Sequence, residues 1–158
     1  MSSRSGPLVR PATLCDADEV VRLAGVMYRS MGLDAADPFW LHAATVALET
    51  RLGGDVAVFV VDDPCHAGRL AASGAGSIAR RLPGPRNPAA LVSYIQWVAT
   101  DERWRRSGFS RAILQALLAW YETHQVRTIE LHATAIGERL YRSLGFEEGP
   151  NPALRLVR

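Results

Sequence analysis

The fold of this chain is decided by the stretch Val98-Ala99-Thr100-Asp101-Glu102-Arg103-Trp104-Arg105-Arg106-Ser107-Gly108-Phe109-Ser110-Arg111-Ala112-Ile113-Leu114. An apolar strand leads into a short turn of arginine, serine and glycine residues, and an amphipathic helix follows at once. The turn therefore lies at a helix N-terminus, where the first backbone amides lack partners within the helix and the helix dipole is positive. Gly108 lets a ligand approach the backbone, Ser110 adds a hydroxyl, and Arg105 and Arg106 add positive charge. These features predict a site for an anion such as a phosphate or pyrophosphate.

The spacing of this turn is Arg105-x-x-Gly108-x-Ser110, which differs from the common nucleotide loops GxxxxGK[ST] and GxGxxG. It resembles the acetyl-CoA loop of the GNAT N-acetyltransferases, Arg/Gln-x-x-Gly-x-Gly/Ala, with a serine at the last small position. A second stretch, Leu140-Tyr141-Arg142-Ser143-Leu144-Gly145-Phe146, resembles the closing motif of that family, L-Y-x-x-x-G-F. Both motifs stand in the order that the family uses, and the resemblance covers about residues 90–150.

Hydrophobic spacing predicts the other elements of the chain. Strands are expected at 8–10, 56–61, 69–80, 90–100 and 128–133, helices at 17–31, 38–51, 108–124 and 135–144, and closing strands at 146–147 and 153–157. The strand–helix–strand order around the loop implies parallel pairing, so the fold class is α/β, a mixed sheet with helices on both faces. The resemblance implies the GNAT fold, with six to seven strands and two central parallel strands that splay apart at the loop.

The central strand, residues 90–100, has side chains that should alternate between the two faces of the sheet. One face is expected to carry Tyr94, Gln96, Val98 and Thr100, and the other Ile95, Trp97 and Ala99.

The composition indicates a soluble globular protein. The 158 residues suit one domain, expected over 1–158, and 48% are hydrophobic while 22% are charged. The N-terminus, Met1 to Pro7, lacks the apolar core of a signal peptide, and no apolar run is long enough to span a bilayer. We therefore expect a cytoplasmic protein without a membrane partner. Cys15 and Cys65 follow no metal-binding spacing and are expected to be reduced thiols.

The charge pattern argues against a nucleic-acid partner. The net charge is only +2, and every basic residue is an arginine. The arginines are spread along the chain and balanced by acidic residues, which differs from the dense basic stripe of a nucleic-acid-binding protein.

The resemblance implies where acetyl-CoA would bind. In the family, the pantetheine arm enters the gap between the splayed strands and pairs with the exposed strand backbone, while the diphosphate lies on the loop. Mapped onto this chain, the strand contacts are Val98, Ala99 and Thr100, and the loop contacts are Arg105, Arg106, Ser107, Gly108, Phe109 and Ser110.

The resemblance also implies catalytic groups. Tyr141 occupies the position of the general acid, which would protonate the departing thiolate, and a backbone N–H near Val98 would stabilise the tetrahedral oxyanion. The base is left open. The glutamate of the histone-modifying branch falls on Tyr94, a poor base near neutral pH, and no acidic residue lies on 90–100. His132 is the best titratable candidate, with deprotonation through water as the alternative. Tyr141 and His132 each also fit a structural role.

These observations lead to three hypotheses. The resemblance implies an N-acetyltransferase that transfers an acetyl group from acetyl-CoA to a primary amine of a small molecule or a protein, in a ternary complex. A non-catalytic acyl-CoA-binding or regulatory module on the same fold is the alternative, because fold does not fix function. A nucleotide- or phosphate-binding protein of another fold is the third. The sequence identifies neither the acceptor nor a strict choice of acetyl over other acyl groups. A homodimer is left open, since dimers are frequent among proteins that resemble this one.

Overall fold

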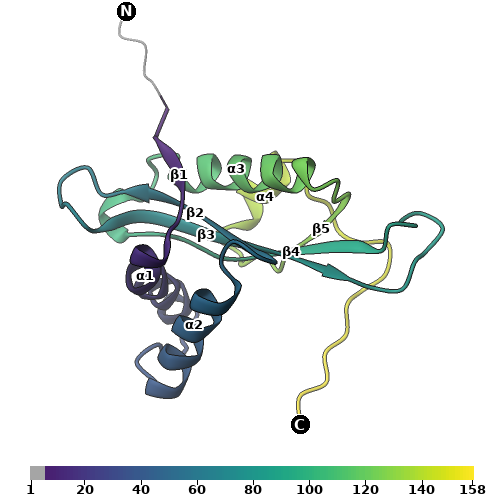
Figure 1. Cartoon of the computed structure of the whole chain (residues 1–158), viewed down its shortest axis with the longest axis horizontal. Helices are drawn as coiled ribbons and strands as arrows, with labels where there is room; N and C mark the ends of the chain where they lie inside the picture. Colours follow the sequence, from purple (N-terminus) through teal and green to yellow (C-terminus); the bar gives the residue numbers. More distant parts are fainter. Residues whose placement is uncertain (1–5) are drawn as a thin grey trace, which may run out of the picture.

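The computed structural model describes residues 6–158 and is built around one five-stranded sheet (Figure 1). The strands are β1 (Val9–Pro11), β2 (Val56–Asp62), β3 (Leu70–Arg80), β4 (Leu91–Thr100) and β5 (Thr128–Glu130), and they lie side by side in that order. Neighbours pair antiparallel from β1 to β4, whereas β4 and β5 pair parallel. The predicted α/β class with a mixed sheet is therefore confirmed, with five strands in the described residues in place of six to seven.

Helices cover both faces of the sheet, as predicted. Figure 1 shows α1 (Ala17–Ser30) and α2 (Pro38–Arg51) on one face, and α3 (Phe109–Thr123) and α4 (Glu138–Ser143) on the other. Two short 3₁₀ turns, η1 (Leu14–Asp16) and η2 (Glu102–Trp104), precede α1 and α3. The start of α2 shows why its predicted bounds hold: Pro38 occupies the first turn, and the Asp37 carboxylate accepts a hydrogen bond of 3.0 Å from the Phe39 amide.

Each face of the sheet has its own hydrophobic core. The core under α1 and α2 includes Val20, Leu23, Leu48, Val58, Val60 and Leu70, and the core under α3 includes Ile95, Ile113, Leu114, Leu117 and Tyr121. Helix α3 lies close to the sheet because β3 carries Gly74 and Gly76 beneath it. A Cβ atom at Gly74 would lie 2.6 Å from Cγ2 of Ile113, and one at Gly76 would collide with the Tyr121 hydroxyl. The two glycines that weaken β3 as a strand thus allow this packing.

A bulge in β4 reverses the alternation of its side chains. Trp97 and Val98 both lie opposite Gly74, because the pairing with β3 moves from Ala75–Gln96 to Ser73–Ala99. Trp97 accommodates the extra residue with a φ of +56°.

The predicted alternation therefore fails across the bulge: Trp97 and Ala99 share a face as predicted, but Ile95 does not lie with them. Ile95 and Val98 both pack into the core under α3, while Trp97 and Ala99 pack into the core under α1. Side chains alternate strictly between the two faces of a sheet only where each residue of a strand pairs with one residue of the neighbouring strand.

The C-terminal part of the chain also departs from the prediction. Strand β5 and helix α4 are shorter than the predicted 128–133 and 135–144, and neither 146–147 nor 153–157 forms a strand. Residues 147–158 leave the sheet and end on the side of α2 (Figure 1). A strand needs a neighbour for its backbone groups, and this segment has none among the described residues. Within the described 6–158, no helix has the length and apolarity to cross a membrane.

Candidate functional site

The parallel strands β4 and β5 separate soon after they meet. Their pairing covers only Val92–Thr128, Ser93–Ile129 and Tyr94–Glu130, whereas β4 continues to Thr100. Beyond Tyr94, the edge of β4 that faces β5 has no strand partner in the described part of the chain. This edge includes Val98, Ala99 and Thr100, the three positions that the resemblance assigned to the pantetheine arm. The splayed strands predicted from the resemblance are present.

The turn after β4 presents a row of free backbone amides. No amide of residues 106–111 donates a hydrogen bond to another group of residues 6–158. The first amide of the helix region to do so is that of Ala112, which donates to the Gly108 carbonyl at 3.1 Å. Arg106 and Gly108 both have positive φ, at 62° and 79°, and turns of this kind form concave anion sites. The amides also lie at the N-terminus of α3, so geometry and helix dipole both favour an anion.

The side chains of this turn, which we call the amide loop (residues 105–111), leave those amides accessible. Arg105 and Arg106 are exposed, and the nearest carboxylate to Arg105 is that of Glu102, at 3.8 Å. The Ser110 and Thr100 hydroxyls form a hydrogen bond of 2.8 Å. This bond ties the end of β4 to the first turn of α3, so the serine in place of the family's glycine or alanine has a partner within the protein.

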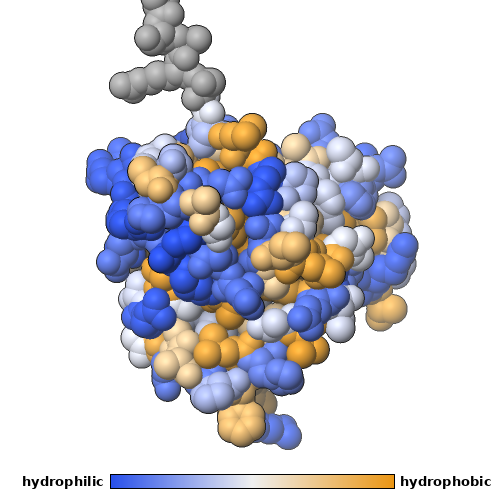
Figure 2. Space-filling model, turned by 60° about the vertical axis from the view of Figure 1, so that its left-hand side comes forward, coloured by the Kyte–Doolittle hydropathy of each residue, from blue (hydrophilic) through white to orange (hydrophobic). Residues whose placement is uncertain are grey.

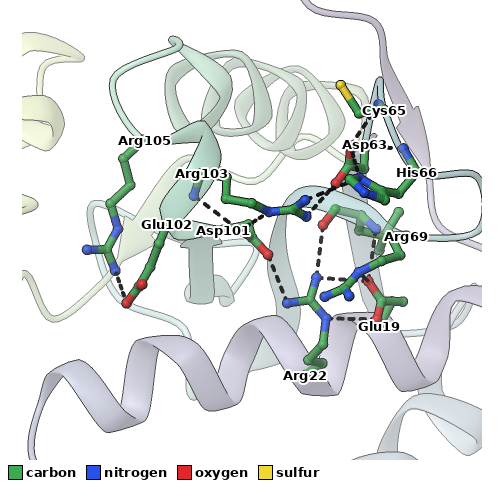
Figure 3. Close-up of polar contacts among 11 residues, drawn as sticks. Glu19, Arg22, Asp63, Cys65, His66, Arg69, Asp101, Glu102, Arg103 and Arg105 are labelled. Carbon is green, nitrogen blue, oxygen red and sulfur yellow. Dashed lines mark hydrogen bonds and ion pairs between the residues drawn. The ribbon is translucent and has the colours of Figure 1, made fainter.

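A network of ion pairs holds the turn that leads from β4 into the amide loop (Figure 3). The Asp101 carboxylate is nearly buried and accepts hydrogen bonds from the Arg103 amide at 3.2 Å and from Arg22 of α1 at 3.0 Å. Arg103 in turn donates to Asp63, at 2.7 Å, whose side chain is fully buried in the β2–β3 loop. Arg22 also pairs with Glu19 at 2.7 Å. Three segments far apart in the sequence are thus joined beside the loop.

Asp63 is ionised in this network. Burial raises its pKa, but the hydrogen bond from the Cys65 amide and the charge of Arg103 act in the opposite direction and more strongly. The net result is a pKa of about 2. On the face of the molecule shown in Figure 2, hydrophilic residues cover much of the surface, with separate apolar patches between them.

His132 lies across the gap between the strands from Tyr94. The Tyr94 hydroxyl oxygen is 2.5 Å from Nδ1 of His132, and the two rings have centroids 5.6 Å apart. Burial raises the pKa of Tyr94, while the positive charge of Arg155 partly opposes the increase, so this phenol stays protonated near neutral pH. When Nδ1 of His132 carries the proton and donates to Tyr94, Nε2 has a free lone pair and can accept a proton.

Tyr141 lies on α4, partly buried, with its ring edge-on to Phe146 at 5.9 Å between centroids. Gly137 supports the same ring, since a Cβ atom there would lie 3.0 Å from Cε2 of Tyr141. Burial raises the pKa of Tyr141, and the nearby Tyr94 adds to the increase. The phenol is therefore protonated near neutral pH and can act as a hydrogen-bond or proton donor.

An open pocket of about 550 Å³ lies beside the amide loop on the α1 side. Its walls are Val26, Arg29 and Ser30 of α1 and Asp101, Glu102, Arg103 and Arg105. The same turn of α1 carries Tyr28, whose hydroxyl accepts a hydrogen bond of 3.1 Å from the indole of Trp97 at the bulge. Trp40 of α2 packs edge-on against Tyr28, at 5.4 Å between ring centroids.

The structure therefore places His132 beside Tyr94 where β4 and β5 separate, and the amide loop at the end of β4. Sequence reasoning missed the part played by Arg22, Asp63 and Tyr94. The first two contact the turn after β4 from 79 and 40 residues away, and no local motif signals such contacts.

Comparison with known proteins agrees with this geometry. A sequence model described as "Acetyltransferase (GNAT) domain" matches residues 54–148. The chain belongs to the GNAT acetyltransferase family. Acetyl-CoA is the co-substrate of this family, and an amine is the acceptor. The resemblance seen in the two sequence motifs is confirmed, and the third hypothesis, a phosphate-binding protein of another fold, is wrong.

Solved structures show the same GNAT fold over nearly the whole chain. One is a predicted acetyltransferase with acetyl-CoA from Clostridium acetobutylicum, with a TM-score of 0.84, 18% identity, and coverage of 95% of both chains. Another is a GCN5-related N-acetyltransferase from Ralstonia eutropha, with a TM-score of 0.78, 23% identity, and coverage of 96% of this chain and 99% of the other. A third is glucosamine-6-phosphate N-acetyltransferase from Arabidopsis thaliana, with a TM-score of 0.70, 15% identity, and coverage of 98% of both. No curated protein sequence matches this GNAT chain.

Proposed function

We propose that this GNAT protein is an N-acetyltransferase that moves an acetyl group from acetyl-CoA to a primary amine of a small molecule or a protein. The acceptor amine attacks directly, in a ternary complex, and residues 1–158 act as one catalytic domain. The observation that carries this proposal is the row of amides at 106–111 that have no hydrogen-bond partner among residues 6–158. They lie next to a strand edge that has no neighbour in the same part of the chain.

The two halves of acetyl-CoA fit these two features. The diphosphate would accept hydrogen bonds from the amides of residues 106–111, with Arg105 and Arg106 adding charge. The pantetheine amides would pair with the open edge of β4 at Val98, Ala99 and Thr100, in the way that a peptide adds to a sheet. This arrangement directs the thioester toward the gap between β4 and β5.

The reaction forms one C–N bond and breaks one C–S bond. The neutral amine attacks the thioester carbonyl carbon, and the resulting oxyanion accepts a hydrogen bond from the Val98 amide. The bulge at Trp97 supports this assignment, because a bulge leaves a backbone group of the strand unpaired. When the C–S bond breaks, Tyr141 donates its proton to the thiolate. Holding both substrates in attack geometry supplies much of the rate.

The proton of the attacking amine goes to His132, directly or through one water. His132 is exposed on the far side of the gap, and Tyr94 holds its ring at Nδ1. With Nδ1–H donating to Tyr94, Nε2 is free to accept the proton. Direct transfer to bulk water is the competing route, and it predicts no dependence of the rate on His132.

A non-catalytic acyl-CoA-binding module is the alternative. It is favoured by one observation: β4 carries no carboxylate that could act as a base. Both functions require binding of acetyl-CoA, but only the enzyme transfers its acetyl group.

Two measurements separate them. Isothermal titration calorimetry with acetyl-CoA, with ATP as the control nucleotide, tests the site. Release of the free thiol of CoA in the presence of a panel of primary amines tests the reaction. Turnover that depends on Tyr141 supports the enzyme. Binding without turnover for every amine supports the module, and absence of binding at millimolar acetyl-CoA contradicts both.

A further inference from the structure

The open pocket beside the amide loop contains an arginine that no acidic group balances. Arg29 is exposed in the last turn of α1 and lines this pocket. No ion pair within residues 6–158 joins it to a carboxylate. Arg105 lies on the other wall, 3.8 Å from the Glu102 carboxylate, whose side chain is 78% exposed. Both guanidinium groups are therefore accessible to a ligand in the pocket.

The other charges beside the pocket already have partners. Arg22, about two turns earlier on α1, donates to Asp101 at 3.0 Å. The ion-pair network that includes this contact has three arginines and three carboxylates, which are Arg22, Arg69 and Arg103 with Glu19, Asp63 and Asp101. Since this network is electrically balanced and Arg105 pairs with Glu102, Arg29 leaves the pocket with one unbalanced positive charge.

The shape of the pocket suits a small molecule. Arg22, Val26 and Arg29 follow one another along one face of α1, at helical spacing. Figure 3 shows this helix running beneath Glu102 and Arg105, which line the same pocket. Val26 supplies an apolar wall, and the volume of about 550 Å³ lies in the range of small-molecule sites. The pocket can therefore hold a short carbon chain with one anionic end.

The turn of α1 that carries Arg29 also reaches the proposed reaction centre. The adjacent Tyr28 accepts a hydrogen bond of 3.1 Å from Trp97, at the bulge of β4 beside the proposed oxyanion donor. The Arg29 guanidinium lies on the side of the aromatic residues: a Cβ atom on Gly25 would be 3.4 Å from its Nη1 and 3.8 Å from Cη2 of Trp40. The pocket and the thioester path therefore border the same turn of α1.

We propose that Arg29 and Arg105 bind an anionic group of the acceptor, so that the substrate is a small amine that also carries a carboxylate or a phosphate. A guanidinium can donate two parallel hydrogen bonds to either group. Arg29 supplies the unbalanced charge, and Arg105 lies between this anion and the diphosphate site. The amine end of the acceptor is then directed toward the bulge at Trp97. This inference rests on the proposed acetyl transfer and adds the class of the acceptor to it.

The first test compares amines that differ in the anionic group. γ-Aminobutyrate is paired with n-butylamine, and O-phosphoethanolamine with ethanolamine, so that one pair reports on a carboxylate and the other on a phosphate. Release of the CoA thiol gives kcat/KM for each amine. The wild-type chain should prefer the anionic member of at least one pair by about tenfold or more, the effect of a charge-assisted hydrogen bond.

Arg29→Gln should lose this preference through a higher KM for the amine, with the KM for acetyl-CoA unchanged. The control is Arg86→Gln, an exposed arginine in the β3–β4 loop at the other end of β4, and it should retain the preference. Equal kcat/KM within both pairs, or a preference that survives Arg29→Gln, overturns the proposal. A higher KM for acetyl-CoA in Arg29→Gln also overturns it, because Arg29 would then belong to the cofactor site.

The second test observes the pocket without turnover. ¹H–¹⁵N spectra of the arginine Nε–H groups are recorded, with and without CoA, while each of the four amines is added. The Arg29 signal, identified by its loss in Arg29→Gln, should shift and saturate with an anionic amine and stay in place with its neutral partner. An Arg29 signal that none of the four amines moves overturns the proposal. A shifted signal in a chain that acetylates no amine contradicts the proposed acetyl transfer but supports the anion site, so the two failures are distinguishable.

Discussion

The hydroxyl of Tyr94 and the imidazole of His132 meet across the point where β4 and β5 separate, with Oη 2.5 Å from Nδ1. Thirty-eight residues separate them in the chain, and each comes from one side of the gap. The contact fixes the orientation of the histidine ring, and it leaves Nε2 free to accept a proton when Nδ1 carries the hydrogen. Tyr94 is thereby a positioning residue for the candidate base, although it is itself a poor base.

The hydrogen bond between these two residues predicts a coupled effect on catalysis. Tyr94→Phe should lower kcat about fivefold, the effect of losing about 1 kcal/mol of hydrogen-bond energy, with the affinity for acetyl-CoA unchanged. His132→Asn should lower kcat by about 10²-fold. In the double variant the Tyr94→Phe change should add little further loss, because its effect acts through His132. Steady-state kinetics of the four proteins check this, and strictly multiplicative losses would show that the two residues act separately.

Tyr141→Phe should lower kcat by about 10²-fold, since it removes the proposed general acid while retaining the ring that packs on Phe146. Acetyl-CoA binding, measured by calorimetry, should not change. A variant with wild-type kcat would exclude Tyr141 as the acid.

The pH dependence of kcat supplies a second check on Tyr141. Burial raises its pKa above the ordinary value of 10.0. A general acid must be protonated to act. Activity that depends on Tyr141 is therefore retained at pH values below its raised pKa, and it is lost as the pH rises through that pKa. The wild-type profile should therefore show no decrease from this group below about pH 10, and the decrease above it should be absent from the residual activity of Tyr141→Phe.

Gly108 offers a matched test of the amide loop. Gly108→Val forces a β-branched residue into a left-handed conformation at φ of 79°, where the amides are presented. Gly53→Val imposes the same strain at φ of 83°, after α2 and away from the loop, and both positions have open space around them. We expect similar losses of thermal stability, but a loss of acetyl-CoA affinity of about tenfold or more only for Gly108→Val, about 1.4 kcal/mol. Equal affinities in the two variants would contradict the assigned site.

Asp63 should make the thermal stability of the protein decrease at acidic pH. Its pKa is lowered from 3.8 to about 2 in the folded protein, so its carboxylate stabilises the fold above pH 3.8, and this contribution is lost as the pH falls toward 2. Asp63→Asn should lower the melting temperature at pH 7 by about 5 °C, the order expected for one charge-assisted hydrogen bond. The variant should also flatten the decrease between pH 4 and pH 2. Thermal melts across that range, with the exposed Asp18→Asn as control, test the prediction.

Much of this fold was predictable from local sequence patterns. The bounds of α2 follow from Pro38 and its cap, and the helices α1 and α3 follow from apolar spacing, because these signals lie within the element itself. The amide loop was predictable for the same reason, since a turn between a strand and a helix N-terminus is a local arrangement.

The features that the sequence did not predict depend on partners elsewhere. The bulge at Trp97 exists only in the pairing with β3, where Trp97 and Val98 lie opposite Gly74. The contacts of Arg103 and Asp63 join separate loops. The segment 153–157 has the pattern of a strand but lacks a neighbouring strand within the described chain. Periodicity reports which face of an element is apolar and does not report which strand lies beside it.

The most direct test of the central claim follows the backbone amides of residues 106–111 by ¹H–¹⁵N NMR while acetyl-CoA is added. We predict that these amides show the largest downfield proton shifts in the protein, saturating at one ligand per chain, as they donate hydrogen bonds to the diphosphate. Binding that leaves these six amides unmoved, or no binding at millimolar acetyl-CoA, would contradict the account.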